Sequence, residues 1–395
     1  MRLILKLVPR LFFIWRIILS TRLVCALLLL RSAAWCASGL TYSTYLREGF
    51  TPAGIVTDST GNVLVAGSTQ NSATVAKVNP TGSQYVYVRT FGGSVSDAAT
   101  GIAVDGAGNA YVTGTTSSPD FPVTPGSTTG TLPGAGQTRA FLVKFDPNGE
   151  TIFSTVLGSV TTTGLAVIVT PSGQIIVSGV SGMGLGASQN AYSVPDTTGR
   201  PFLMEIDPTG STLVVVATGI GGNALGLDAA GNIYMAGGTI YTDYPTTPGA
   251  YQTVLNPVYL PCVGAGGCMY DFSGTNQYVT KVDPAATKLI FSTGMSQSTT
   301  RNGGMAVDPA GNVYLTGLTY GAYGWTVLPA NAAMVNPFVT RLDLTGSRIS
   351  YSIPIGGAGI AAVRDAAIAH GATSAALSSL PQRTLACRPL YSCNA

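Results

Sequence analysis

The sequence is poor in charge and in histidine. Only 9% of its 395 residues are charged, and His370 is its single histidine. A disordered polyelectrolyte carries far more charge than this. With 50 glycines and 46% hydrophobic residues, the composition indicates an all-β chain rich in turns rather than a helix-rich enzyme. A serine hydrolase or a histidine-dependent lyase needs a positioned imidazole base, so one histidine near the C-terminus argues against both.

Acidic residues are absent before residue 40, whereas basic residues are frequent there. The basic residues of this segment are Arg2, Lys6, Arg10, Arg16, Arg22 and Arg31. Without these six, the formal net charge of +3 becomes −3, from 14 basic and 17 acidic residues. The body of the chain therefore has no basic excess of the kind that indicates nucleic-acid binding.

The same segment has the order of a secretory signal peptide. A basic start is followed by a short apolar run, residues 23–30 (LVCALLLL), and then by small residues at 32–34 and 37–39. We predict cleavage between Ala34 and Ser38, so that residues 1–38 are a signal peptide and the mature chain is secreted or held at the cell surface. The alternative is an uncleaved anchor, but no uncharged run here reaches the roughly 20 residues of a spanning helix. We expect no stable membrane span after cleavage.

Close pairs of cysteines remain after the predicted cleavage. In an exported chain such pairs indicate disulfides. The segment between Cys262 and Cys268 (VGAGG) is flexible, and we predict a bridge between these two residues. A zinc site would need histidines or further cysteines nearby, and we expect no metal and no cofactor.

One hairpin pattern recurs along the chain. Its clearest copy is residues 101–116 (GIAVDGAGNAYVTGTT), in which two apolar runs flank the turn from Asp105 to Asn109. The Asp side chain can accept backbone hydrogen bonds and close the turn, and Gly108 can take a positive φ without steric cost. A degenerate copy has Thr170 and Gln174 in the Asp and Asn positions. The predicted structural turn residues are Asp58, Gly61, Asp105, Gly108, Asp228, Gly231, Asp308 and Gly311.

A second turn signal, Asp-Pro-x-Gly or a relative of it, follows each hairpin. Each repeat therefore predicts two hairpins, or four strands. For the second repeat the predicted strands are residues 100–105, 109–116, 140–146 and 151–158. The segment AFLVKF, at the start of the third of these strands, is apolar on both faces, so neighbouring sheets must stack on it.

The segment GIAVDGAGNAYVTGTTSSPDFPVTPG, with the later FLVKFDPNGETIFSTVLG, resembles the SBBP-type β-propeller repeat of bacterial exported proteins. The resemblance covers residues 40–357 and implies a β-propeller of four-stranded antiparallel blades, five clear and a sixth partial or decayed. A ring of sheets also avoids long exposed edges. We expect repeats over residues 39–357, and a degenerate last blade or a disordered tail over residues 358–395. Residues 40–46 (LTYSTYL) match a fourth strand and would complete the last blade.

Two connections between a second and a third strand are long, over residues 117–138 and 240–275. Variable loops on one face of a repeat protein are the usual place of function. Asp120 and Asp243 occur there in matched pieces (DFPVTPG, DYPTTPG), which favours loop anchors with the following ring packed beneath. The tyrosines of the second loop could also stack on a sugar or contact a protein. The possible binding face comprises Asp120, Phe121, Asp243, Tyr244, Tyr251, Tyr259 and Tyr270.

These observations favour an exported, non-catalytic binding or scaffold module with a protein or glycan ligand, and we predict no catalytic residues. The alternative is an extracellular hydrolase of polysaccharide that uses carboxylates of the variable face, with Asp97 and Asp271 as further candidates. Such a pair would lie about 5–10 Å apart in a cleft. A truncated remnant of a longer repeat protein is the third hypothesis, because the end of the chain resembles nothing upstream.

Overall fold

The structure, a computed structural model, describes residues 46, 48–126, 129–158, 160–182, 184–194, 200–239, 241–255, 276–296, 300–320 and 335–354. All of them belong to one compact unit, Leu46–Ala395. Every regular element in these ranges is a β-strand, which confirms the all-β fold class. None of these residues forms a helix long and apolar enough to cross a membrane. The predicted signal peptide, most of the closing strand at residues 40–46 and the predicted sixth blade lie outside the described ranges.

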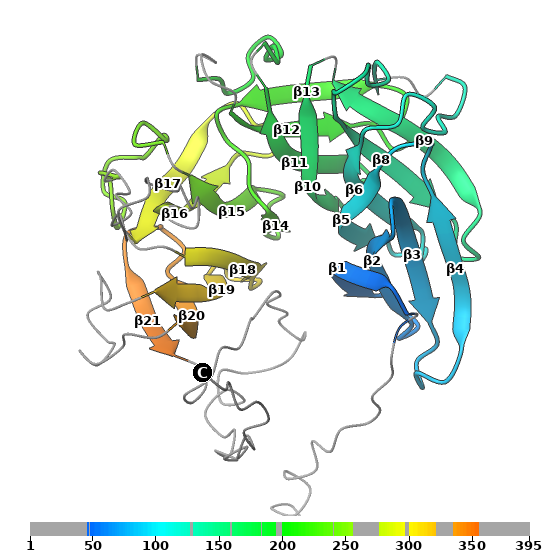
Figure 1. The fold of residues 1–395 in the computed structure, drawn as a ribbon. Coiled ribbons are helices and arrows are strands. Elements are labelled where there is room, and N and C mark those ends of the chain that lie inside the picture. The colour runs from blue at the N-terminus through cyan, green and yellow to red at the C-terminus, as the bar shows by residue number, and fades with distance from the viewer. Residues whose placement is uncertain are drawn as a thin grey trace, which may run out of the picture. The chain divides into compact units, whose positions relative to one another are not determined.

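The strands form five sheets in which each antiparallel strand pairs with the next along the chain, as in the blades of a propeller (Figure 1). We call the strands of each blade A to D in chain order. Blade 1 has β1 (Phe50–Thr57), β2 (Val63–Thr69), β3 (Ser72–Val78) and β4 (Tyr85–Phe91). Blade 2 has β5 (Asp97–Val104), β6 (Ala110–Thr116), β8 (Arg139–Phe145) and β9 (Thr151–Gly158), and the short β7 (Thr129–Gly130) adds to β9 in parallel. Blade 3 has β10 (Thr162–Val169), β11 (Ile175–Ser181), β12 (Pro201–Ile206) and β13 (Leu213–Thr218).

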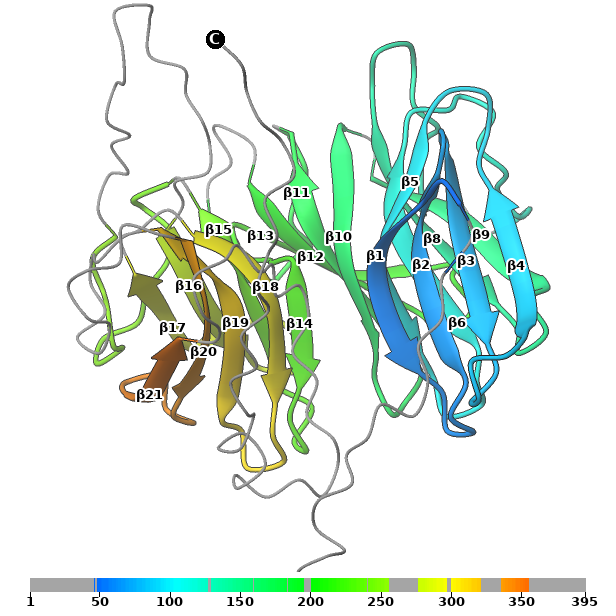
Figure 2. The same cartoon turned by 60° about the horizontal axis from the view of Figure 1, so that its bottom comes forward.

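The last two described blades repeat this order. Blade 4 has β14 (Ala224–Leu227), β15 (Ile233–Thr239), β16 (Asn276–Val282) and β17 (Leu289–Ser296). Blade 5 has β18 (Thr300–Val307), β19 (Val313–Tyr320), β20 (Val335–Leu342) and β21 (Ile349–Pro354). In the view of Figure 2 the A strands of neighbouring blades, such as β14 and β18, lie side by side, as their contacts also show. The five clear blades expected from the sequence are therefore confirmed.

Strand A of blade 2 begins three residues earlier than the hydrophobic pattern predicts. β5 starts at Asp97, because a β-bulge between Ala99 and Gly101 lets the strand continue past Thr100. Blades 1, 3 and 5 have a bulge at the matching place. A bulge bends its strand and redirects side chains. The Thr100 hydroxyl donates to Gly164 O of blade 3 at 2.8 Å, so the extra residue links two neighbouring A strands.

The hydrophobic core is divided among the interfaces between adjacent blades. One buried cluster includes Val75 of blade 1 and Phe145 of blade 2, and the next includes Phe153 of blade 2 and Phe202 of blade 3. Two further clusters join blades 3 and 4 and blades 4 and 5. Because each inner sheet is buried on both faces, a strand such as β8 is buried and apolar over consecutive residues. This confirms that the sheets stack on one another.

A glycine in the C–D turn of one blade lies under an aromatic ring from strand D of the preceding blade. A Cβ atom added at Gly149 would lie 2.7 Å from the ring of Tyr87, and one added at Gly210 would lie 2.5 Å from the ring of Phe153. Both glycines have a positive φ, +82° and +74°. These positions require glycine for two reasons, since the left-handed conformation is costly for other residues and the ring leaves no room for a methyl group.

Blade 4 varies this contact on both sides at once. Its C–D turn has Ala286 with a φ of +51° instead of glycine. The residue of blade 3 in register with Phe153 is Val215, which pairs with Glu205 as Phe153 pairs with Lys144. Val215 packs against the buried cluster that contains Ala286. A smaller side chain on one blade therefore accompanies a larger turn residue on the next.

Candidate functional site

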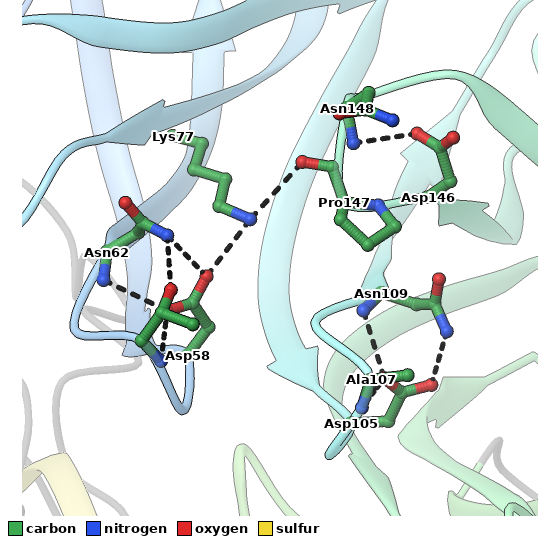
Figure 3. Close-up of polar contacts among 10 residues, drawn as sticks. Asp58, Asn62, Lys77, Asp105, Ala107, Asn109, Asp146, Pro147 and Asn148 are labelled. Carbon is green, nitrogen blue, oxygen red and sulfur yellow. Dashed lines mark hydrogen bonds and ion pairs between the residues drawn. The ribbon is translucent and has the colours of Figure 1, made fainter.

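The predicted Asp turns lie at one end of the blades, where strands A and B join. In blade 2, Asp105 Oδ1 accepts hydrogen bonds from the backbone N–H groups of Ala107 (3.0 Å) and Asn109 (2.9 Å), and Oδ2 accepts one from the Asn109 side chain at 2.8 Å (Figure 3). Burial alone would raise the pKa of Asp105, but hydrogen bonds from Asn109, Tyr111 and Ala107 lower it. Gly108 has a φ of +84°. The same geometry recurs at Asp58 and Gly61, Asp228 and Gly231, and Asp308 and Gly311.

Two of these carboxylates also pair with a lysine of strand C. Lys77 Nζ lies 3.0 Å from Asp58 Oδ2, and the two side chains are 4% and 3% exposed. The same ammonium group donates to Pro147 O of blade 2 at 3.2 Å (Figure 3). Lys281 and Asp228 form the matching pair in blade 4, at 2.9 Å. In blade 1 the pair therefore links the A–B turn to its own strand C and to the next blade.

Blade 3 replaces the members of this network together. Thr170 and Gln174 stand in the Asp and Asn positions, and Glu205 stands where the other blades have lysine or arginine on strand C. Gln174 donates to Glu205 Oε1 at 3.1 Å. Burial raises the pKa of Glu205, and the hydrogen bond from Gln174 partly opposes this. Without an aspartate in the turn, a lysine on strand C would have no anion to pair with. Blade 3 accordingly lacks both the aspartate and the lysine.

The A–B turns of blades 2 to 5 line a hollow of about 790 Å³. Its lining includes Asp105, Asp228 and Asp308 among small residues such as Gly106 and Ala229. The three carboxylates accept hydrogen bonds from their own turns. In the part of the chain that the structure describes, no group of three His, Cys, Asp or Glu residues could hold a metal ion. The hollow thus offers space, whereas its acidic groups serve the turns.

At the opposite end of blade 2, Asp120 joins the B–C loop to the connection that leaves blade 1. Its Oδ1 accepts the backbone N–H and the hydroxyl of Ser94, at 2.8 and 2.9 Å. These two hydrogen bonds lower the pKa of Asp120. The next residue, Phe121, is 2% exposed and stacks on Phe141 with ring centroids 5.1 Å apart. The carboxylate acts as an anchor, and the Phe121 ring is not presented to a ligand.

Asp97 closes the same loop from a buried position. Its Oδ2 accepts the Gly93 N–H at 2.7 Å and the Ser118 hydroxyl at 2.9 Å. The Ser118 hydroxyl oxygen in turn accepts the Val95 N–H at 2.9 Å. Asp97 is buried, so this candidate for acid–base chemistry lies under the loop that it holds.

The matched residue of blade 4, Asp243, reaches back to blade 3. Its two oxygens accept hydrogen bonds from both terminal nitrogens of Arg200, at 2.9 and 2.7 Å, and these bonds lower its pKa. The Arg200 guanidinium also lies over the Tyr241 ring, 5.0 Å from its centroid. Tyr244 is 4% exposed and stacks on Tyr278 with centroids 3.9 Å apart. Asp243 and Tyr244 therefore repeat the anchor and buried ring of blade 2.

Tyr251 differs from these residues because its side chain is 42% exposed. Val254, three residues later, is also exposed. The described end of the blade 4 loop therefore presents aromatic and aliphatic surface. The remaining residues selected from this loop, Tyr259, Tyr270, Cys262 and Cys268, lie outside the described residues. The bridge between the two cysteines stays a prediction: free-thiol labelling of the purified, unreduced chain should leave both unmodified, and labelling of both would disprove it.

Sequence reasoning missed what the B–C connections do in blades 2, 3 and 4. Each connection lies on the outer edge of strand D of its own blade, where a serine or threonine binds one strand residue through both its N–H and its hydroxyl oxygen. Thr124 N donates to Ser154 O at 2.8 Å, and Ser154 N donates to Thr124 Oγ1 at 3.0 Å. The sequence signal is a Ser or Thr four residues before a Tyr in blades 3 and 4. The matched pairs are Thr124 with Ser154, Ser188 with Val216, and Thr247 with Ser292.

Comparison with known families agrees with this architecture. A family model described as SBBP, beta-propeller repeat, matches residues 86–122, which confirms that this chain carries the repeat its sequence resembles. The matched segment begins in strand D of blade 1 and ends in the B–C loop of blade 2. The sequence repeat is therefore offset by one strand from the structural blade.

Solved structures that align with the chain are distant in sequence. They include hydrazine synthase of Kuenenia stuttgartiensis, with 13% identity, a TM-score of 0.43 and coverage of 77% of this chain and 66% of that chain. Cobalt-substituted apocarotenoid oxygenase of Synechocystis has 12% identity, a TM-score of 0.41 and coverage of 78% and 63%. The Dos1 propeller has 9% identity, a TM-score of 0.37 and coverage of 78% and 69%. The chain thus spans less than two thirds of the length of the first two proteins. No curated protein matches its sequence.

Proposed function

We propose that this propeller is an exported, non-catalytic recognition module that binds a protein or a glycan with its B–C loops, on the face where these loops leave the strands and on the outer edge that they follow. The observation that carries the proposal is the role of the described aspartates on that face. Asp97, Asp120 and Asp243 each accept two hydrogen bonds that fix a loop or join two blades. Carboxylates used in this way position the loops, and the loops supply the surface.

The direction of the pKa shifts supports binding rather than carboxylate catalysis. A glycoside hydrolase needs one carboxyl group that stays protonated long enough to act as the acid, which requires a raised pKa. The pKa values of Asp120 and Asp243 are lowered by their donors. The pKa of Glu205 is raised, but this residue bonds the A–B turn of blade 3 through Gln174, at the end away from the loops.

The exposed residues of the B–C loops and of the connection before blade 2 are of the kind that binds without chemistry. Tyr251, Val254 and Val95 are all exposed. An aromatic ring with a polar tip combines apolar contact area with a hydrogen bond, as in protein and sugar recognition. The backbone of Tyr251 is held in place beside the C–D turn of blade 5, since its N–H donates to Gly346 O at 2.9 Å. A loop backbone that is held before binding loses little conformational entropy when a ligand binds.

The test is a binding and hydrolysis screen of the purified mature chain with soluble glycans and extracellular proteins. We expect a saturable ligand whose affinity falls at least tenfold in Tyr251→Ala. Tyr85→Ala is the matched control, because Tyr85 is exposed to a similar extent on strand D of blade 1. Equal loss in both variants would contradict a site on the B–C loops.

A further inference from the structure

Strand D is the outermost strand of each blade, and its outer edge has no neighbouring four-stranded sheet (Figure 1). In blades 2, 3 and 4 the B–C connection lies on this edge. Blade 1 differs, because only Gln70 and Asn71 connect β2 to β3 and they cannot reach β4. In the described ranges, the outer backbone groups of β4 have a single such contact, from Arg89 Nη1 to Val88 O at 3.4 Å. As far as the described residues go, the edge of β4 is therefore open to an additional strand.

The strand register identifies the residue that would bind. Val88 pairs with Ala76 of strand C, and the matching residue of blade 3, Val216, pairs with Met204. Val216 directs its N–H and C=O outward to Ser188, with both bonds at 2.9 Å. Since Val88 has the same register and the same side chain, its N–H and C=O point outward in the same way.

The sequence of β4 leaves this edge unprotected. Natural edge strands are usually blunted by charged side chains, proline or bulges. β4 reads YVYVRTF, with Tyr85 and Val86 44% and 50% exposed and Arg89 as its one charged residue. Arg89 guards the edge only weakly, because only its Nη1 contacts it, 3.4 Å from Val88 O, while its Nε donates to Gly149 O at 2.8 Å and its Nη2 to Glu150 Oε1 at 2.7 Å, both in blade 2.

The same Arg89 contact explains how blade 1 does without a covering loop. In blades 3 and 4 the loop tyrosine completes the contact with the next blade: Tyr192 N donates to Ala286 O at 2.8 Å and Tyr251 N to Gly346 O at 2.9 Å. In blade 1, Arg89 reaches the equivalent turn carbonyl. The contact between blades is thus preserved, while the edge that a loop would occupy stays free.

We propose that the outer edge of β4 binds an extended segment of another protein by strand addition, with a serine or threonine of that segment opposite Val88. The segment runs parallel to β4, as β7 runs parallel to β9 and Ser193 pairs in parallel with Thr218. A second copy of this chain would not fit this geometry, because the same edge strand of two subunits related by a two-fold axis meets antiparallel. The site is on an edge that the B–C connection of blade 1 does not reach, so this inference does not depend on the proposed function.

The probe is a labelled peptide with the sequence of residues 186–194 (GASQNAYSV), taken from the segment that covers Val216. It is titrated into the full mature chain and followed by fluorescence anisotropy. We expect saturable binding that weakens at least tenfold in Val88→Pro, which removes one outward N–H. Proline is tolerated at edge positions whose N–H faces solvent, so the blade should still fold. A peptide with alanine in place of its first serine tests the same contact with the protein unaltered and should bind at least tenfold more weakly.

Val216→Pro is the matched control, because the Val216 N–H is already bound to Ser188. Binding that falls in Val216→Pro and persists in Val88→Pro would place the peptide on blade 3 and overturn the proposal. Absence of binding at millimolar peptide would also overturn it. Slow amide exchange at Val88 in the free chain would overturn it too, because a segment of the chain itself would then cover the edge. A dimer that Val88→Pro dissociates would likewise overturn it.

Discussion

Exchange of Gly210 for alanine is the sharpest test of how adjacent blades fit together. The variant forces a side chain into a left-handed residue with a φ of +74°, which costs about 1–2 kcal/mol. It also places Cβ 2.5 Å from the buried ring of Phe153, and such overpacking costs about 1–3 kcal/mol. We therefore expect Gly210→Ala to lower the free energy of unfolding by about 2–5 kcal/mol.

Gly231→Ala separates the two contributions. Gly231 has a φ of +80°, and an added Cβ would lie at an ordinary contact distance of 3.7 Å from Pro284. This variant should show the backbone cost of about 1–2 kcal/mol and no more. The difference between the two variants measures the clash with Phe153.

Adding Phe153→Val to Gly210→Ala gives the interface of blades 2 and 3 a valine facing an alanine, the combination that Val215 and Ala286 form between blades 3 and 4. Phe153→Val alone should destabilise, because it removes a buried ring and leaves a cavity. Combined with Gly210→Ala it should cost less than the sum of the single variants, with an interaction energy of about 1–3 kcal/mol. Urea unfolding at equilibrium gives the four free energies. Additivity within about 0.5 kcal/mol would refute the idea that ring size and turn residue are matched across the interface.

Three further predictions concern the charged contacts. Asp58→Ala should cost about 3–5 kcal/mol in urea unfolding, because it leaves buried Lys77 without its anion; a loss below about 1 kcal/mol would mean that the pair behaves as an exposed one. Burial would raise the pKa of Asp228, but the hydrogen bonds that it accepts from Asn232 and Lys281 lower the pKa from 3.8 to about 2. The stabilisation that ionised Asp228 provides is therefore present above about pH 4 and is lost as the pH falls toward 2. Asp228→Asn should flatten the decline of the melting temperature over that range, and an unchanged decline would contradict this linkage. Arg200→Lys should cost about 0.5–1 kcal/mol because the two-pronged bond to Asp243, whose side chain is 61% exposed, is lost, whereas an unchanged melting temperature would show that the bond joins the blades without stabilising them.

Features contained in a few consecutive residues could be predicted from the sequence. The turn at Asp105 is one, because its cap, its glycine and its Asn109 partner lie within five positions. The repetition of that turn gave the number of described blades. The start of β5 was misplaced because the bulge next to Thr100 breaks the alternation on which strand prediction depends.

Contacts between blades were harder to predict, because they join residues far apart in the chain. Lys77 and Pro147 are 70 positions apart, and nothing near Lys77 marks the partner. For Phe121 and Tyr244, the matched pieces of sequence did favour burial beneath a loop. The open edge of β4 could be found only by superposing the strand registers, since the missing loop of blade 1 has meaning only beside the loops of the other blades.

The B–C loops are proposed to recognise a ligand and to do no chemistry. The most direct measurement is incubation of the purified mature chain with a panel of extracellular polysaccharides, with bound glycan and newly released reducing ends determined in the same samples. We predict saturable binding to at least one glycan, or binding only to protein ligands, with no reducing ends released. Release of reducing ends that Asp120→Asn or Asp243→Asn abolishes in a folded chain would contradict it, because those carboxylates would then be catalytic and not anchors.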